Sequence, residues 1–186
     1  MKKLSLLLTL FIAGAGLKAV AQNFPIDTLT KKVSFVEVVQ APAYTKSSGF
    51  DRGLVVLHRM YKQADSKIKV SDKDNGIIVL NGFTQLMMKG KGGILVPDPD
   101  LVLYKLTIAF KNGKYRYEFT DFQQNRSGVP IHIEKWIEHN VPGDNFYSPK
   151  DHIQENLDFI YEDIHKRINE FKTGMLGDKT IEKNDW

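Results

Sequence analysis

The stretch LVLYKLTIAFKNGKYRYEFTDF, residues 101–122, carries the clearest pattern in the chain. Apolar and polar residues alternate through most of it, and Asn112-Gly113 stands near its middle. Alternation with a period of two is typical of a half-buried strand, and Asn-Gly between two such runs is the strongest short signal for a β-hairpin. The stretch therefore predicts two antiparallel strands joined by a tight turn.

The register of this hairpin follows by counting outward from the turn. One face carries the opposed pairs Phe110 and Tyr115, Ile108 and Tyr117, and Leu106 and Phe119. The other face carries Ala109 and Arg116, Thr107 and Glu118, and Lys105 and Thr120. Because side chains two residues apart share a face, the first face is apolar and the second is polar. We interpret the aromatic row as core, since an RNA-binding sheet exposes its rings on the outer face.

Two amphipathic helices are predicted to cover the apolar face. In residues 45–64, the apolar residues Phe50, Leu54, Leu57 and Tyr61 recur at the spacing of one helical face, and Ser48 with Asp51 has the form of a capping box. A second helix is expected to follow the cap Ser148-Pro149 and to end at Gly174. Its apolar stripe is Ile153, Leu157, Ile160, Ile164, Ile168 and Phe171.

Three more strands complete the expected sheet. They are VSFVEVVQ at 33–40, KIKVSD at 67–72 and GIIVLNGFTQLMM at 76–88, the last two joined near Asp74-Asn75-Gly76. The glycines of KGKGG, residues 89–93, mark a loop, residues 123–147 an irregular insertion, and residues 175–186 a flexible tail. The order β-α-β-β-β-β-α predicts an α+β domain, with two helices on one face of a mostly antiparallel sheet.

The N-terminus has the three parts of a secretory signal. Lys2 and Lys3 precede the apolar run LSLLLTLFIAGAG, and Ala19-Val20-Ala21 offers the small residues that a signal peptidase requires. We expect cleavage after Ala21, one domain over residues 22–174 in the periplasm or outside the cell, and no transmembrane segment after cleavage. The chain has no cysteine, which excludes a lipid-anchoring cysteine and disulfides. Removal of three lysines with the signal lowers the net charge to about +1, which argues against a nucleic-acid partner.

Three segments together resemble an exported bacterial family that is catalogued as a domain of unknown function with a TBP-like fold. They are FPIDTLTKKVSFVEVV at 24–39, VSDKDNGIIVLNG at 70–82 and GKYRYEFTDF at 113–122. The resemblance implies the fold and export. It brings no catalytic residue, ligand or cofactor, and a fold of this kind does not by itself make a DNA-binding protein.

The strongest chemical candidate is HIEKWIEH at 132–139, where His132, Glu134, Glu138 and His139 could be zinc ligands. The spacing matches no HExxH motif, and along a strand His139 would face away from His132 and Glu134. We interpret the segment as a solvated loop and predict no metal. GKGG at 90–93 lacks the Walker spacing, Ser127 and Ser148 lack a nucleophile elbow, and SDKDNG at 71–76 lacks the closing glutamate of a calcium loop.

The sequence thus predicts a cofactor-free binding or interaction domain of the cell envelope, with a protein or another envelope component as its partner. One alternative is a metal-dependent or other hydrolase that uses His132, Glu134 and His139. Another is a structural oligomer formed through an exposed sheet edge.

Overall fold

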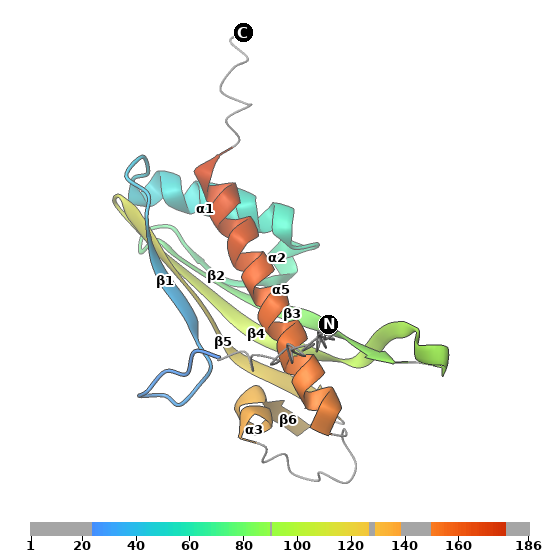
Figure 1. Cartoon of the computed structure of the whole chain (residues 1–186). Helices are drawn as coiled ribbons and strands as arrows, with labels where there is room; N and C mark the ends of the chain where they lie inside the picture. Colours follow the sequence, from blue (N-terminus) through green and yellow to red (C-terminus); the bar gives the residue numbers. More distant parts are fainter. Residues whose placement is uncertain (1–23, 90, 127–128, 139–149, 178–186) are drawn as a thin grey trace, which may run out of the picture.

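A computed structural model describes residues 24–89, 91–126, 129–138 and 150–177. The expected signal sequence, Ser148-Pro149, His139 and residues 178–186 lie outside the described residues. The elements, in chain order (Figure 1), are β1 Phe35–Gln40, α1 Lys46–Met60, α2 Ala64–Lys67, β2 Ile68–Asp72, β3 Ile77–Lys89, η1 Lys91–Gly93, β4 Leu95–Lys111, β5 Lys114–Arg126, β6 Val129–His132, α3 Ile133–Ile137 and α5 Lys150–Leu176.

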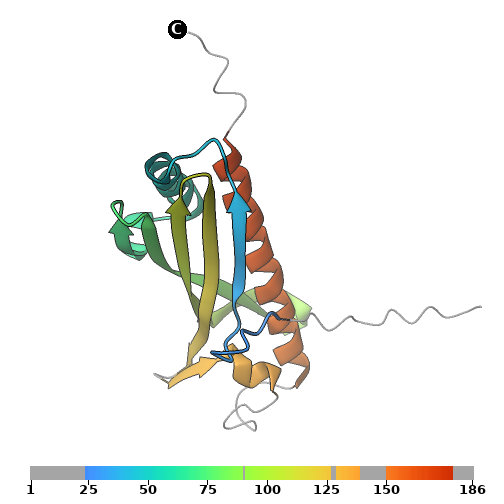
Figure 2. The ribbon, with the colours of Figure 1, turned by 90° about the vertical axis from the view of Figure 1, so that its left-hand side faces the viewer.

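The strands form one six-stranded antiparallel sheet in the order β1-β5-β4-β3-β2. β6 also pairs with β5, so β1 and β6 share one edge of that strand. β1 opposes β5 from Lys114 to Phe119, and β6 opposes it from Gln123 to Arg126. Figure 2 shows β1 beside the upper part of the hairpin and β6 at its lower end.

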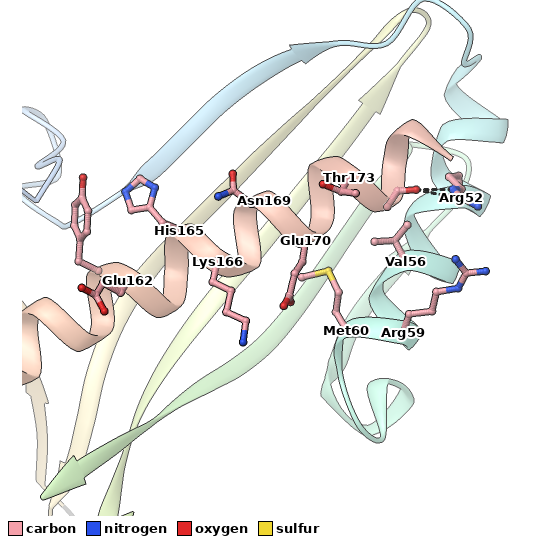
Figure 3. A pocket seen from close by; sticks show the side chains of 12 residues that line it. Arg52, Val56, Arg59, Met60, Glu162, His165, Lys166, Asn169, Glu170 and Thr173 are labelled. Carbon is pink, nitrogen blue, oxygen red and sulfur yellow. Dashed lines mark hydrogen bonds between the residues drawn. The ribbon is translucent and has the colours of Figure 1, made fainter. Parts of the chain in front are cut away.

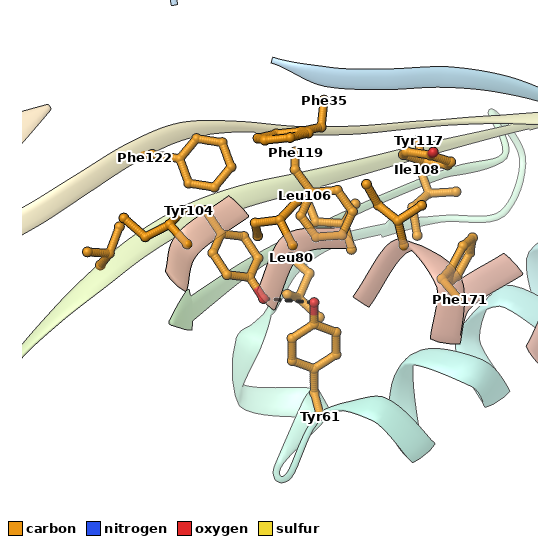
Figure 4. Close-up of a cluster of buried hydrophobic side chains, with 14 of the residues drawn as sticks. Phe35, Tyr61, Leu80, Tyr104, Leu106, Ile108, Tyr117, Phe119, Phe122 and Phe171 are labelled. Carbon is orange, nitrogen blue, oxygen red and sulfur yellow. Dashed lines mark hydrogen bonds between the residues drawn. The ribbon is translucent and has the colours of Figure 1, made fainter. Parts of the chain in front are cut away.

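The predicted hairpin register is confirmed. Phe110 opposes Tyr115, Ile108 opposes Tyr117 and Leu106 opposes Phe119 across the β4–β5 turn. These six side chains are buried, whereas Lys105, Thr107, Arg116 and Glu118 on the other face are at least partly exposed. The aromatic row is therefore the inner face of the sheet, as Figure 4 shows for Tyr117 and Phe119.

α1 and α5 both lie on this inner face and cover it (Figure 1), which confirms the predicted α+β architecture. The predicted stripe of α5 is buried throughout, from Ile153 to Phe171. On α1, Phe50, Leu57 and Tyr61 are buried and Leu54 packs against the core.

Two predicted helix boundaries are wrong. α1 is capped by Thr45, whose side chain accepts the N–H of Ser48 while the Ser48 hydroxyl accepts the N–H of Thr45, so the capping box lies three residues earlier than expected. α5 continues past Gly174 to Leu176, and Gly177 follows with φ +82°. Gly174 instead lies where α5 crosses α1, because a Cβ there would stand 2.7 Å from Cγ1 of Val56.

The irregular insertion predicted at 123–147 is wrong over its first half. β5 runs on to Arg126, β6 follows from Val129, and residues 133–137 form the helix α3. Pro130 lies within β6, which in the described chain pairs with β5 alone, and an edge strand tolerates a residue that has no N–H. The rest of the predicted insertion lies beyond the described residues, apart from Glu138 at the end of α3.

β3 and β4 extend past the other strands as a two-stranded arm, at the right of Figure 1. β2 opposes β3 only from Ile77 to Leu80, and the pairing of β4 with β5 ends at Val102 and Gln124. η1 closes the tip of the arm, where the glycine-rich loop was predicted. Pro97 and Pro99 stand on its β4 strand.

Candidate functional site

A cavity of about 980 Å³ lies between α1 and α5 (Figure 3), and we call it the α1–α5 groove. The residues that line it are Arg52, Val56, Arg59 and Met60 of α1, and Tyr161, Glu162, His165, Lys166, Asn169, Glu170, Thr173 and Gly174 of α5. Its volume lies within the range of about 300–1,000 Å³ that is common for binding sites. Both walls are regular helices, so the positions of the side chains are set by secondary structure.

Arg52 fixes one end of the groove. Its Nε and Nη2 both donate to the carbonyl oxygen of Gly174, at 2.8 and 2.5 Å (Figure 3). The last carbonyls of a helix have no donor within the helix, and a cation near them is favoured by the helix dipole. Arg52 therefore ties the end of α5 to α1 at the point where Gly174 contacts Val56.

The charged side chains of the groove are of both signs. Arg59 and Lys166 are cations, and Glu162 and Glu170 are carboxylates, all four of them exposed. Within the described chain, none of the four takes part in an ion pair or a side-chain hydrogen bond. Met60 and the buried Val56 of α1 add an apolar lining. The groove thus offers uncommitted charges beside an apolar lining.

His165 is the residue of the groove best suited to acid–base chemistry, and its surroundings do not favour that role. Its ring packs at 4.2 Å from the ring of Tyr161 and at 5.5 Å from that of Phe35, measured between centroids. In the described structure no hydrogen bond joins it to a carboxylate or a hydroxyl, although a general base needs partners within hydrogen-bonding reach. The contacts of His165 with aromatic rings indicate packing rather than proton transfer.

The predicted zinc candidates are not brought together in the part of the chain that the structure describes. His132 is an exposed residue at the end of β6, and Glu134 lies in the first turn of α3, where it accepts the N–H of Val33 at 2.7 Å. Glu138 pairs with Lys135, three residues before it. Among the described residues no cluster of three or more potential ligands is suited to a metal ion, and His139 lies outside them.

A buried polar network lies beneath α5. The hydroxyls of Tyr61 and Tyr104 are 2.9 Å apart (Figure 4), and the guanidinium of Arg167 packs over both rings. Asp163 accepts hydrogen bonds from Arg167 and from the hydroxyl of Thr84, at 2.9 and 2.7 Å. Burial raises the pKa of both tyrosines. Each polar group of the network has a partner, so we interpret it as structural.

A second cavity, of about 610 Å³, lies at the turn end of the hairpin, and we call it the hairpin-end cavity. It is lined by Val39, Gln40, Ala41, Pro42, Ala43, Tyr44, Arg52, Tyr115, Lys172, Met175, Leu176 and Gly177. Sequence reasoning missed both cavities, because their residues come from segments far apart in the chain. The only signal was the pair of predicted helices, which had to lie side by side.

Residues 35–125 match the family model DUF4468, described as a domain of unknown function with TBP-like fold. Two solved structures are similar to the chain. A DUF4468 family protein from Bacteroides ovatus has a TM-score of 0.61 and 16% identity, over 83% of this chain and 92% of that one. A TBP-like protein from Parabacteroides distasonis has a TM-score of 0.56 and 14% identity, over 80% and 96%. No curated protein matches the chain. None of the helices in the described chain has the length and apolar character to span a membrane.

Proposed function

We propose that this chain, a member of the DUF4468 family of domains with a TBP-like fold, is an exported, non-catalytic binding domain of the cell envelope. No activity is named for that family. The observation that carries the proposal is the α1–α5 groove. Its partner, in this proposal, is a protein.

The charges of the groove support a protein partner. Arg59 and Lys166 line the same groove as Glu162 and Glu170, and none of the four has a partner within the described chain. Nucleic-acid sites gather cations to neutralise phosphates, whereas protein interfaces combine an apolar centre with a polar rim of both signs. Val56 and Met60 would form part of that centre.

The proposal of an envelope location rests on the N-terminal sequence. Lys2 and Lys3, the apolar run and Ala19-Val20-Ala21 together have the form of a cleavable secretory signal. N-terminal sequencing of the protein isolated from fractionated cells checks this part. A mature chain that begins at Gln22 in the periplasmic or extracellular fraction is expected, and a chain in the cytosol that retains Met1 would contradict it.

Site-specific cross-linking tests the groove. A photoreactive amino acid in place of Arg59 or Glu170 is expected to capture one protein in living cells, and the same amino acid in place of Val38, on β1 away from the groove, is not. The captured protein, once purified, should bind the chain, and Lys166→Glu should weaken that binding by about tenfold through loss of a charge pair. Lys111→Glu, at the hairpin turn, is the matched control. Equal capture at all three positions, or equal effects of the two charge reversals, would contradict the proposal.

A further inference from the structure

We infer that the hairpin-end cavity is a binding site for a small apolar molecule that carries a carboxylate. The inference goes beyond the proposed function, because the site is separate from the α1–α5 groove and takes a different kind of ligand. The two cavities share Arg52, which stands between them.

The walls of the cavity are suited to an apolar body. Val39, the loop residues Ala41 to Ala43, and Met175 and Leu176 of α5 surround it. Leu176 is 84% exposed, so an apolar surface of the molecule lies open at this end. The volume of about 610 Å³ lies in the middle of the range of common ligand sites.

The hydroxyl of Tyr115 is the first polar group of the cavity that has no partner in the described chain. The residue lines the cavity but is only 3% exposed, since its ring packs between Phe110 and Phe171. In the described chain its hydroxyl makes no hydrogen bond. A buried hydroxyl without a partner is unfavourable, and nearly all such groups in proteins are satisfied. A ligand oxygen in the cavity would satisfy it.

Arg52 supplies the second contact. Two of its nitrogens donate to the carbonyl of Gly174, which leaves further N–H groups of the guanidinium. No carboxylate of the described chain pairs with it.

The other charged and hydroxyl groups at the cavity are already engaged. Lys172 is held by Glu37 at 2.9 Å, Glu37 also accepts from Tyr117, and Tyr44 donates to the carbonyl of Met175. Lys172 and Glu37 form an ion pair, so Arg52 is the cation of the cavity that has no counter-charge in the described chain. Arg52 can only donate and the Tyr115 hydroxyl can donate, whereas a carboxylate only accepts. A carboxylate on an apolar body therefore complements both the open contacts and the walls.

The inference is tested by titrating the purified chain with octanoate and measuring the backbone amide signals by two-dimensional NMR. Saturable shifts are expected at Ala41, Ala43 and Met175, and not in the residues of the arm. Octylamine has the same apolar tail with a cationic head, and it is expected to bind at least about tenfold more weakly because it meets Arg52. Equal binding of the two compounds, or no saturable shift with octanoate, would overturn the inference.

Single substitutions locate the site. Tyr115→Phe removes only the hydroxyl and should weaken octanoate binding about tenfold, the usual effect of one hydrogen bond to a charged group. Arg52→Gln removes the charge but keeps a donor for Gly174, and it should reduce the preference for octanoate over octylamine. Tyr104→Phe removes a hydroxyl far from the cavity and should leave binding unchanged. If Tyr115→Phe and Tyr104→Phe bind octanoate alike, the site is not the hairpin-end cavity.

Discussion

Tyr104 and Tyr115 lie on the same covered face of the sheet, yet their hydroxyls have opposite surroundings. That of Tyr104 is hydrogen-bonded to Tyr61 within the network that includes Arg167. That of Tyr115 has no hydrogen bond in the described chain and lines a cavity. Burial raises the pKa of both, that of Tyr115 to about 12. Burial alone thus does not distinguish a structural tyrosine from a ligand-binding one, and the missing partner does.

The largest expected effect comes from the aromatic packing that both tyrosines share. Phe119 is 1% exposed, and its ring packs against those of Tyr104 and Tyr117. Phe119→Ala should lower the free energy of unfolding by about 3–5 kcal/mol. Arg116→Ala, on the uncovered face, should change it by less than about 0.5 kcal/mol. Urea denaturation measures both, and comparable losses would mean that the two faces are not as different as described.

The second effect concerns the network around Tyr104. Asp163→Ala removes the acceptor of Arg167 and of the fully buried Thr84, and we expect a loss of about 2–3 kcal/mol in the free energy of unfolding. Asp158→Ala is the control on the same helix, because within the described residues Asp158 accepts a hydrogen bond from the exposed Gln154 alone. A loss at Asp163 no larger than at Asp158 would show that the network contributes no stability.

Removal of one hydroxyl from the network should have a smaller effect. Tyr104→Phe leaves the hydroxyl of Tyr61 buried without its partner, at a cost of about 1–2 kcal/mol in the free energy of unfolding. The double variant Tyr61→Phe Tyr104→Phe should regain part of that loss, since it removes both partners. Thermal and urea denaturation of the three variants would test this, and additive losses would count against the pairing.

Tyr115→Phe should differ from Tyr104→Phe in sign or in size. It removes a hydroxyl that has no partner in the described structure, so the free energy of unfolding should rise or stay within about 0.5 kcal/mol. The comparison of the two tyrosines fails if urea denaturation gives equal losses for the two variants.

Alkaline pH gives the finest test. The pKa of Tyr115 is near 10 when unfolded and about 12 when folded, so the folded state binds the proton more tightly. The contribution of the protonated Tyr115 hydroxyl to stability is therefore fully present below pH 10 and is lost as the pH rises towards 12. In the Tyr115→Phe variant the free energy of unfolding should fall less steeply over this pH interval. Urea denaturation at each pH measures it. Identical slopes would mean that Tyr115 ionises at its ordinary pKa.

The parts of the fold with regular periods could be predicted from the sequence. The Asn112-Gly113 turn and the alternation around it determine the hairpin register, and the α5 stripe predicts a buried helix face. The end of α5 was mispredicted because Gly174 looks like a helix terminator but is a contact with Val56, which the local sequence does not reveal.

The candidate sites could not be predicted, for a related reason. Arg52 and Gly174 are joined across more than a hundred residues, and so are the walls of both cavities. His132 and Glu134 were considered as zinc ligands because they lie close together in the sequence. In the structure, however, the Glu134 carboxylate accepts a hydrogen bond from the backbone N–H of Val33. The spacing of residues along the sequence reveals a site whose residues lie on one helix or strand. Here the charged and polar groups without partners come together only when α5 packs on α1.

The two-stranded arm has a consequence for behaviour at high concentration. On the N-terminal side of Val102, the β4 strand of the arm has no neighbour on its β5 side in the described chain. Such free edges can pair with other extended chains and start aggregation. Pro97 and Pro99 offer no backbone donor along that edge. A growing fibril needs an unbroken ladder of such donors. The two prolines therefore interrupt pairing along the free edge, and the arm can extend from the domain without promoting aggregation.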